Sequence, residues 1–272
     1  MNKINGNRIR TGKAFIRTEF FDFSIYRASF WLRQLYTFLM MYSVGYVWKA
    51  LYASSSGNMS VGLSDTITYA VLGVALESIM HPSNGPQMYM MQQVRRGSIE
   101  MDIMKPLDFQ FYMFCKNMGQ IIIKLLFLVI PSLVVAYFFF GFTIPGPGQL
   151  LVFLLSLSLG ILVSFLLNFI LGLLSMITMN IRNINWGYNA TLRFFAGQMV
   201  PLWLFPGFLS ILSNILPFRC IYAIPMSIYI GNYSGLSLLG VMSLQLFWIG
   251  ILFIGTRLLM NSIFKRLLIQ GG

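Results

Sequence analysis

Hydrophobic and polar positions alternate along this chain in long blocks, not in the short periods of a soluble helix or strand. The apolar blocks cover residues 30–51, 63–80, 120–140, 150–179, 194–212 and 236–260. A bilayer core of about 30 Å is crossed by roughly 20 apolar residues in an α-helix. The pattern therefore predicts an all-α integral membrane fold with six transmembrane helices.

The composition agrees with this interpretation. Of the 272 residues, 57% are hydrophobic and only 10% are charged, whereas soluble domains carry about 25% charged residues. A soluble enzyme, a secreted disulfide scaffold and a disordered chain are excluded. The polar, basic start of the sequence is not followed by a short apolar run with a small-residue cleavage site, so we expect no signal peptide.

The basic residues orient the predicted spans. The chain has 19 Lys and Arg against 7 Asp and Glu, a net charge of +12. With six spans, every basic residue except Lys49 and Arg219 falls on one side, which the positive-inside rule makes cytoplasmic. Both termini are then cytoplasmic. The basic residues are dispersed between apolar blocks, so we expect no nucleic-acid partner.

The predicted domain organisation is simple. We expect one transmembrane domain over residues 1–272, with a six-span bundle over 30–260 and a short cytoplasmic tail over 261–272. Within residues 1–29, the mixture of aromatic and charged residues from Ala14 onward predicts an interfacial helix that lies along the membrane.

The largest cytoplasmic segment is expected between the second and third spans, over residues 81–119. Gly97 can end one helix, Ser98 can cap the next, and Pro106 can end that one. Asp108 can cap the helix that leads into the third span. A short helix at 98–106 is the result.

This short helix would expose Ile99, Ile103 and Met104, and would place Glu100 and Asp102 near its positive N-terminal end. Two interpretations remain open. The helix couples the membrane domain to a cytoplasmic partner, or the segment is an ordinary basic loop that rests on anionic lipid headgroups.

Small and polar residues recur at every fourth position of the fourth span: Ser156, Gly160, Ser164, Asn168 and Gly172. Such a stripe lets helices approach closely and hydrogen-bond across the contact. Packing within the chain is favoured over a dimer interface.

The segment after the fifth span is too apolar for an ordinary loop and too broken for a span. Pro217, Phe218, Pro225 and Gly231 interrupt it. Irregular backbone at membrane depth must be buried in protein or line a cavity. We expect short re-entrant helices between the fifth and sixth spans; an amphipathic loop on the outer surface is the alternative.

Few residues can carry chemistry. Glu77 is the acidic residue well inside a span, and His81 could pair with it one helical turn away. His81, Cys115 and Cys220 supply too few ligands for a zinc cluster, and Cys115 and Cys220 are expected on opposite sides of the membrane. We expect no metal site, no bound cofactor and no catalytic residues.

Together these parts resemble the permease subunit of an ABC-2 type exporter from bacteria. The stretch Arg95-x-Gly97-x-Ile99 followed by Lys105-Pro106-Leu107 is similar to the inner loop of that family. The segment 197–206, the sequence Leu216-Pro217-Phe218 and the segment 225–231 are similar to one bacterial branch.

The resemblance implies a permease in the bacterial plasma membrane that works with a separate nucleotide-binding subunit, which holds ATP and Mg. This chain has no G-x-x-x-x-G-K-[ST] motif. A second permease copy or a related permease chain is also implied, within membrane lipids. The implied contacts with the nucleotide-binding subunit are Arg95, Arg96, Gly97, Ile99, Glu100, Ile103 and Pro106.

By the same resemblance the second and fifth spans line the cargo path, which makes Glu77, Met199, Trp203 and Phe205 candidate contacts. Their apolar and aromatic character suits amphipathic or hydrophobic cargo such as a drug, a peptide or a lipid-like molecule. The alternative function is an ion-coupled secondary transporter or channel that needs no ATPase. A membrane-anchored assembly factor also stays open, whereas an intramembrane enzyme lacks the paired catalytic groups it would need.

Overall fold

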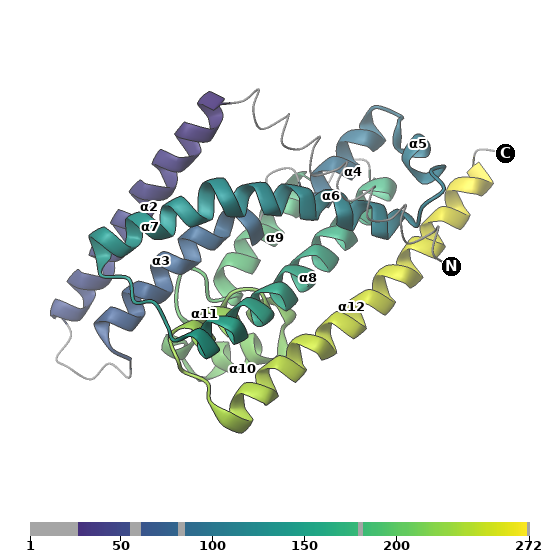
Figure 1. Ribbon diagram of the computed structural model, residues 1–272. Helices are drawn as coiled ribbons and strands as arrows, with labels where there is room; N and C mark the ends of the chain where they lie inside the picture. The colour runs from purple at the N-terminus through teal and green to yellow at the C-terminus, as the bar shows by residue number, and fades with distance from the viewer. Residues whose placement is uncertain (1–26, 55–60, 81–84, 179–181, 271–272) are drawn as a thin grey trace.

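The computed structural model describes residues 27–54, 61–80, 85–178 and 182–270. Over these ranges the chain forms helices and their connections and contains no strand (Figure 1). The all-α fold class is therefore confirmed. The predicted N-terminal interfacial helix and His81 lie outside the described residues.

Among the described residues, four helical segments are long and apolar enough to cross a membrane. They are α3 (Leu63–Met80), the continuous run Phe109–Phe140, α8 (Pro147–Thr178), and residues Gly235–Lys265 of α12 (Gly235–Gln270). A bent pair of short helices, discussed below, makes a fifth if it is counted as one span. The predicted number of six is not confirmed.

The first predicted span lies within α2 (Arg27–Ser54). This helix has 28 residues, so at a rise of about 1.5 Å per residue it is longer than a bilayer core is thick. Its sequence is more polar than those of the other four segments, and it is not among the candidate spans. It packs along α3 in the structure.

The predicted fifth span at 194–212 is wrong. Helix α9 (Arg182–Phe195) ends at the start of this range, and α10 (Gly207–Ile215) begins near its end. Between them Gly197 has a left-handed φ of 75°, and Pro201 and Pro206 flank the 3₁₀ turn η2 (Leu202–Leu204). The left-handed Gly197 turns the backbone out of the helical conformation, and the two prolines remove amide donors that a helix would need here, so α9 ends instead of continuing.

The third span is longer than predicted and contains a defect. Helices α6 (Phe109–Lys124) and α7 (Ile130–Phe140) are joined by the π-helical turn η1 (Leu125–Val129). Pro131 lies at the second position of α7 and cannot donate to the preceding turn, which accounts for the local widening of the helix. The helical run that contains the predicted third span therefore begins at Phe109, within the segment 81–119 that was expected to precede it.

The stripe on α8 packs inside the chain, as favoured from the sequence. Ser164 donates to the Met80 carbonyl at 2.7 Å, and Ser156 donates to Gln245 of α12 at 3.0 Å. A Cβ at Gly160 would lie 2.9 Å from the Cys220 carbonyl oxygen, and one at Gly172 would meet Met90 of α4 (Pro86–Arg95). The stripe thus lets four segments, α3, α4, η3 (Pro217–Cys220) and α12, approach α8 closely.

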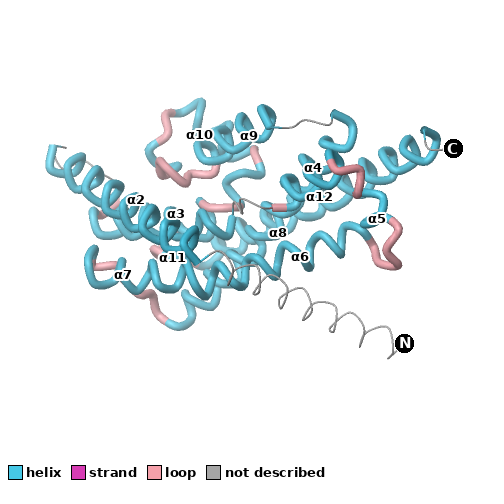
Figure 2. Tube along the Cα trace, turned by 90° about the horizontal axis from the view of Figure 1, so that it is seen from above, coloured by secondary structure: helices cyan, strands magenta, loops and turns pink. Residues whose placement is uncertain are grey.

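Short helices cover one end of the bundle. Helix α10 and the pair η3 (Pro217–Cys220) and α11 (Ala223–Tyr229) are bent by 71° at their junction. All seven residues of α11 are buried. Figures 1 and 2 place α10 and α11 away from α5 (Ile99–Ile103) and the C-terminal end of α12, which lie together at the opposite end.

Candidate functional site

Helix α4 ends at a glycine turn that places α5. Gly97 has a left-handed φ of 66°. Its amide donates to the Val94 carbonyl, and the Ser98 amide donates to the Gln93 carbonyl at 3.0 Å. These two bonds define a Schellman motif, in which glycine has no Cβ to oppose the left-handed conformation. The prediction that Gly97 ends a helix is confirmed.

The short helix after Gly97 presents a different face from the one predicted. Ile99 is only 8% exposed, while Met101 and Met104 are 73% and 83% exposed. Ile103 is partly buried. The expected apolar surface is therefore correct only for Met104, because in a helix of five residues a small error in its starting angle changes which side chains face outward.

Ser98 does not cap α5 as predicted. No side-chain capping bond is formed at this position, and the Ser98 hydroxyl donates instead to Gln93, one turn earlier in α4. The side chain thus strengthens the α4 end of the turn. The helix α5 is held instead by the contacts of Asp102, described next.

Asp102 is the group that anchors α5. Its carboxylate is only 6% exposed and accepts hydrogen bonds from Tyr89 of α4 at 2.7 Å, from Lys105 at 2.6 Å and from Tyr112 of α6 at 3.3 Å. Lys105 also donates to the Tyr112 hydroxyl at 2.9 Å. We call Tyr89, Asp102, Lys105 and Tyr112 the Asp102 cluster; it joins α4, α5 and α6.

The cluster changes the proton affinity of two of its members. Burial alone would lower the pKa of Lys105, but its hydrogen bonds to Asp102 and Tyr112 outweigh this and raise it. Burial, and then the hydrogen bonds with Tyr112 and Asp102, raise the pKa of Tyr89. The ammonium and the neutral phenol are therefore the forms present at neutral pH.

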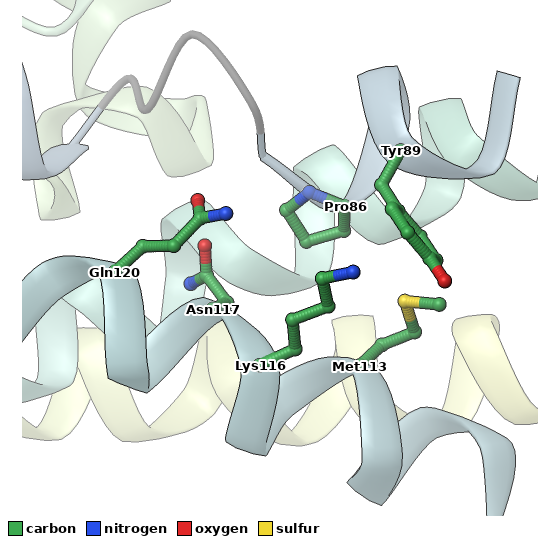
Figure 3. A pocket seen from close by; sticks show the side chains of 6 residues that line it. All are labelled: Pro86, Tyr89, Met113, Lys116, Asn117 and Gln120. Carbon is green, nitrogen blue, oxygen red and sulfur yellow. The ribbon is translucent and has the colours of Figure 1, made fainter. Parts of the chain in front are cut away.

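A small pocket opens beside the cluster, between α4 and α6. Figure 3 shows side chains of α6 facing the start of α4. The Lys116 ammonium lies 3.3 Å from the centre of the Tyr89 ring, a cation–π contact. The pocket is lined by Pro86, Tyr89, Met113, Lys116, Asn117 and Gln120. Its buried amide oxygens suit a water molecule better than a larger ligand.

Asp108 fastens the start of α6, as predicted. Its side chain accepts from the Phe111 amide at 2.9 Å, which satisfies one of the unpaired amides of the first turn. It also forms an ion pair with Arg257 of α12. Partial burial would raise the pKa of Asp108, but the bond from Arg257, and then that from Phe111, lower it.

The residues predicted to contact a nucleotide-binding subunit differ in how exposed they are. Arg95, Arg96, Gly97, Glu100 and Pro106 are exposed, whereas Ile99 packs inward. Met101 and Lys105 are exposed at the same tip and were not among the predicted contacts. Together with Met104, the exposed residues among these form a basic, partly apolar surface, which we call the α5 tip.

Glu77 lies in a second polar contact. It pairs with Arg193 of α9 at 2.5 Å, and the two side chains are 19% and 39% exposed. A carboxylate on α3 is thereby neutralised by a guanidinium from a helix more than a hundred residues away in sequence. Sequence reasoning missed this pair because it considered only His81, one helical turn away, as a partner for Glu77, and treated Arg193 only as one of the basic residues of the cytoplasmic side.

The aromatic residues predicted along the cargo path are distributed over the connection between α9 and α10. Trp203 packs edge-on against Tyr69 of α3, with ring centres 4.8 Å apart. Phe205 stacks on Phe194 at 5.0 Å. Met199 is exposed.

This connection is fixed to α3 at one close contact. The Tyr69 hydroxyl donates to the Gly197 carbonyl at 2.9 Å. A Cβ at Gly197 would lie 2.9 Å from the same hydroxyl, so this approach requires glycine.

The four residues predicted in the re-entrant region lie in its short helices and in the turn that follows them. Pro217 begins η3, Phe218 lies within it, and Pro225 lies within buried α11. Gly231 has a left-handed φ of 82° directly after α11. The broken, short-helical character of the region is confirmed; the geometry is that of a bent span or a re-entrant loop.

Other reactive groups are sparse in the described ranges. Cys115 and Cys220 are both free thiols. Over the described residues no group of three or more His, Cys, Asp and Glu side chains could hold a metal ion.

These features define a class of protein. It is a multi-pass helical membrane protein in which a hydrogen-bonded polar cluster holds α5 at one end and short broken helices lie at the other. The sequence matches the family model described as ABC-2 family transporter protein over residues 38–271. The chain therefore belongs to the ABC-2 transporter family. A comparison with curated proteins finds no match. The permeases of this family are membrane transport domains without an ATPase site of their own.

Proposed function

We propose that this chain is the permease subunit of an ATP-driven ABC exporter in the bacterial plasma membrane, with both termini in the cytoplasm. A separate nucleotide-binding subunit would hold ATP and Mg and supply the work. A second permease copy or a related permease would complete the transport unit. Membership of the ABC-2 family supports the ATPase partnership.

The α5 tip carries the proposal. It projects from the end of the bundle that also holds the C-terminal end of α12 (Figure 1). Its exposed side chains combine two methionines with several basic groups. A lipid headgroup layer would attract the basic groups and could also take up the two methionines, so it is membership of the ABC-2 family, which implies an ATPase subunit, that favours a protein partner at this surface. A protein partner with an apolar socket fits both features.

The contacts around α5 provide a path for mechanical work. Closure of two nucleotide-binding subunits on ATP would push on the α5 tip. The Asp102 cluster connects α5 to α6, which continues into the membrane as one helical run to Phe140. The ion pair between Asp108 and Arg257 joins this run to α12, and α4 packs along α8. A push at the tip would therefore move several spans together.

The cargo would be amphipathic or hydrophobic, such as a drug, a peptide or a lipid-like molecule. Met199 and the partly exposed rings of Trp203 and Phe205 offer apolar contacts, and Glu77 with Arg193 offers a polar one. These residues lie on or beside the connection between α9 and α10. That connection would move when the α9 and α3 contacts rearrange.

The test is co-purification from the native host. We expect the detergent-solubilised chain to bring down a nucleotide-binding subunit, and we expect Glu100→Arg or deletion of residues 99–104 to abolish this. Charge reversal at Asp65, which lies in the first turn of α3, is the matched control and should retain the subunit. A chain that transports in vesicles without any ATPase would instead identify an ion-coupled transporter or a channel.

A further inference from the structure

Asp102 differs from the exposed residues around it because its carboxylate is buried and hydrogen-bonded. Of the two acidic residues in α5, Glu100 is exposed and Asp102 is buried. A buried carboxylate is costly unless it is paired and hydrogen-bonded. Asp102 has three donors on its two oxygens, from Tyr89, Lys105 and Tyr112.

We propose that Asp102 is a positioning residue: its contacts with Tyr89, Lys105 and Tyr112 lock α5 onto α4 and α6 so that Met101 and Met104 are presented rigidly to the nucleotide-binding subunit. This inference rests on the proposed function. It assigns the docking contact to the Met101 and Met104 face, and it assigns the orientation of that face to a side chain that does not touch the partner.

The length of α5 makes such a lock necessary. A helix of five residues forms too few internal hydrogen bonds to be stable by itself. It needs anchors from neighbouring elements. Ile99 supplies an apolar anchor, the Schellman motif at Gly97 sets the entry angle, and Asp102 supplies the polar anchor that reaches both α4 and α6.

The geometry of the anchor selects the outward face. Asp102 points into the molecule, so Met101 and Met104, which lie on either side of it along the helix, point away from the bundle. Arg95, Arg96 and Lys105 are exposed nearby in the sequence. The complementary surface on the partner is an apolar socket with acidic residues at its rim.

Rigidity matters because ordering a mobile helix on binding reduces the affinity. A contact face that is already in its bound orientation loses less conformational entropy when the partner docks. If the polar anchor is removed, α5 must be ordered by the partner, and each methionine contributes less to the affinity because it is correctly placed only part of the time.

The experiment is a titration of the purified nucleotide-binding subunit against the full-length chain in lipid nanodiscs. We expect Asp102→Asn to raise the Kd about tenfold, since hydrogen bonds to a charged group contribute on the order of a factor of ten in an equilibrium constant. We expect Met104→Ala to raise the Kd by about the same factor. Asp65→Asn removes a carboxylate outside the docking region and should leave the Kd unchanged.

The double variant separates positioning from general destabilisation. If Asp102 acts by presenting Met104, then Met104→Ala costs clearly less in the Asp102→Asn background, and the double variant falls well short of the product of the two single effects. Effects that multiply fully would overturn the inference, because they would mean that Asp102 acts independently of Met104.

Milder variants keep the test valid if Asp102→Asn folds poorly. Tyr89→Phe and Tyr112→Phe each remove one hydroxyl but leave the carboxylate paired with Lys105, and each should raise the Kd by about threefold. Wild-type affinity in Asp102→Asn or in both tyrosine variants would overturn this inference alone. A wild-type chain that binds no nucleotide-binding subunit would overturn the proposed function and this inference with it.

Discussion

The contact between α8 and η3 allows a quantitative prediction about Gly160. A Cβ at this position would lie 2.9 Å from the Cys220 carbonyl oxygen and 3.0 Å from that of Ile221. Both are backbone atoms, so neither can rotate away as a side chain could. The Cys220 carbonyl is also held by Gln245, whose amide donates to it at 2.9 Å. Gly160→Ala must therefore push η3 away from α8.

The size of the effect follows from three contributions. Overpacking a close contact costs about 1–3 kcal/mol, and weakening the bond to Gln245 costs about 1 kcal/mol. The better helix propensity of alanine returns about 1 kcal/mol. The net destabilisation is about 1–3 kcal/mol, and each kcal/mol lowers Tm by about 2–4 °C in a protein of this size.

The assay is thermal unfolding in detergent at a fixed heating rate, followed by tryptophan fluorescence. Gly250→Ala is the matched control, because Gly250 lies inside α12 and a Cβ there meets no atom within 4 Å. We expect Gly160→Ala to unfold at a lower temperature than wild type and Gly250→Ala to unfold at the same or a higher one. Equal shifts in the two variants would refute the reasoning.

Three further predictions use the same measurement. Asp108→Ala should lower Tm at neutral pH through about 1 kcal/mol of lost capping. Because the pKa of Asp108 is lowered in the folded state, the higher Tm of the wild type should persist above about pH 4 and disappear as the pH falls through that folded pKa. A difference in Tm that does not depend on pH would contradict this. Gln245→Leu should cost about 1–3 kcal/mol, since it removes three buried hydrogen bonds to α8 and η3; an unchanged Tm would count against it. Arg193→Ala should lower Tm more when Glu77 is intact than in Glu77→Gln, with a coupling of about 1–2 kcal/mol, and strictly additive shifts would argue against the pair.

The sequence was sufficient where a single residue determines local structure. Gly97 was predicted to end a helix and Asp108 to cap the helix that leads into the third span, and both do so. The regular spacing from Ser156 to Gly172 identified the close-packed face of α8. In each case the physical requirement is local or repeats along one helix.

The sequence was insufficient where distant segments combine. The prediction of a span over 194–212 relied on the apolar character of the segment as a whole and gave too little weight to Gly197, Pro201 and Pro206. The partner of Glu77 could not be predicted from the sequence because Arg193 approaches from a separate helix. Asp102 looked like a favourable charge at a helix start, but its actual role depends on two tyrosines from neighbouring helices.

The inner face of α5 shows why short amphipathic helices are hard to orient from sequence. Ile99 and Met104 are both apolar, yet one is buried and the other is the most exposed large apolar residue of the tip. The Gly97 turn and the anchor at Asp102 determine which of these two side chains is buried. Both act through the three-dimensional positions of α4 and α6.

The central claim is that this chain transmits work from a separate ATPase into the membrane. Native mass spectrometry of the complex purified from its own host tests this most directly. The account predicts an assembly that contains two permease chains and two copies of a nucleotide-binding subunit, and that loses those subunits when residues 99–104 are deleted. A wild-type chain that appears only alone, or only with other copies of itself, would contradict it.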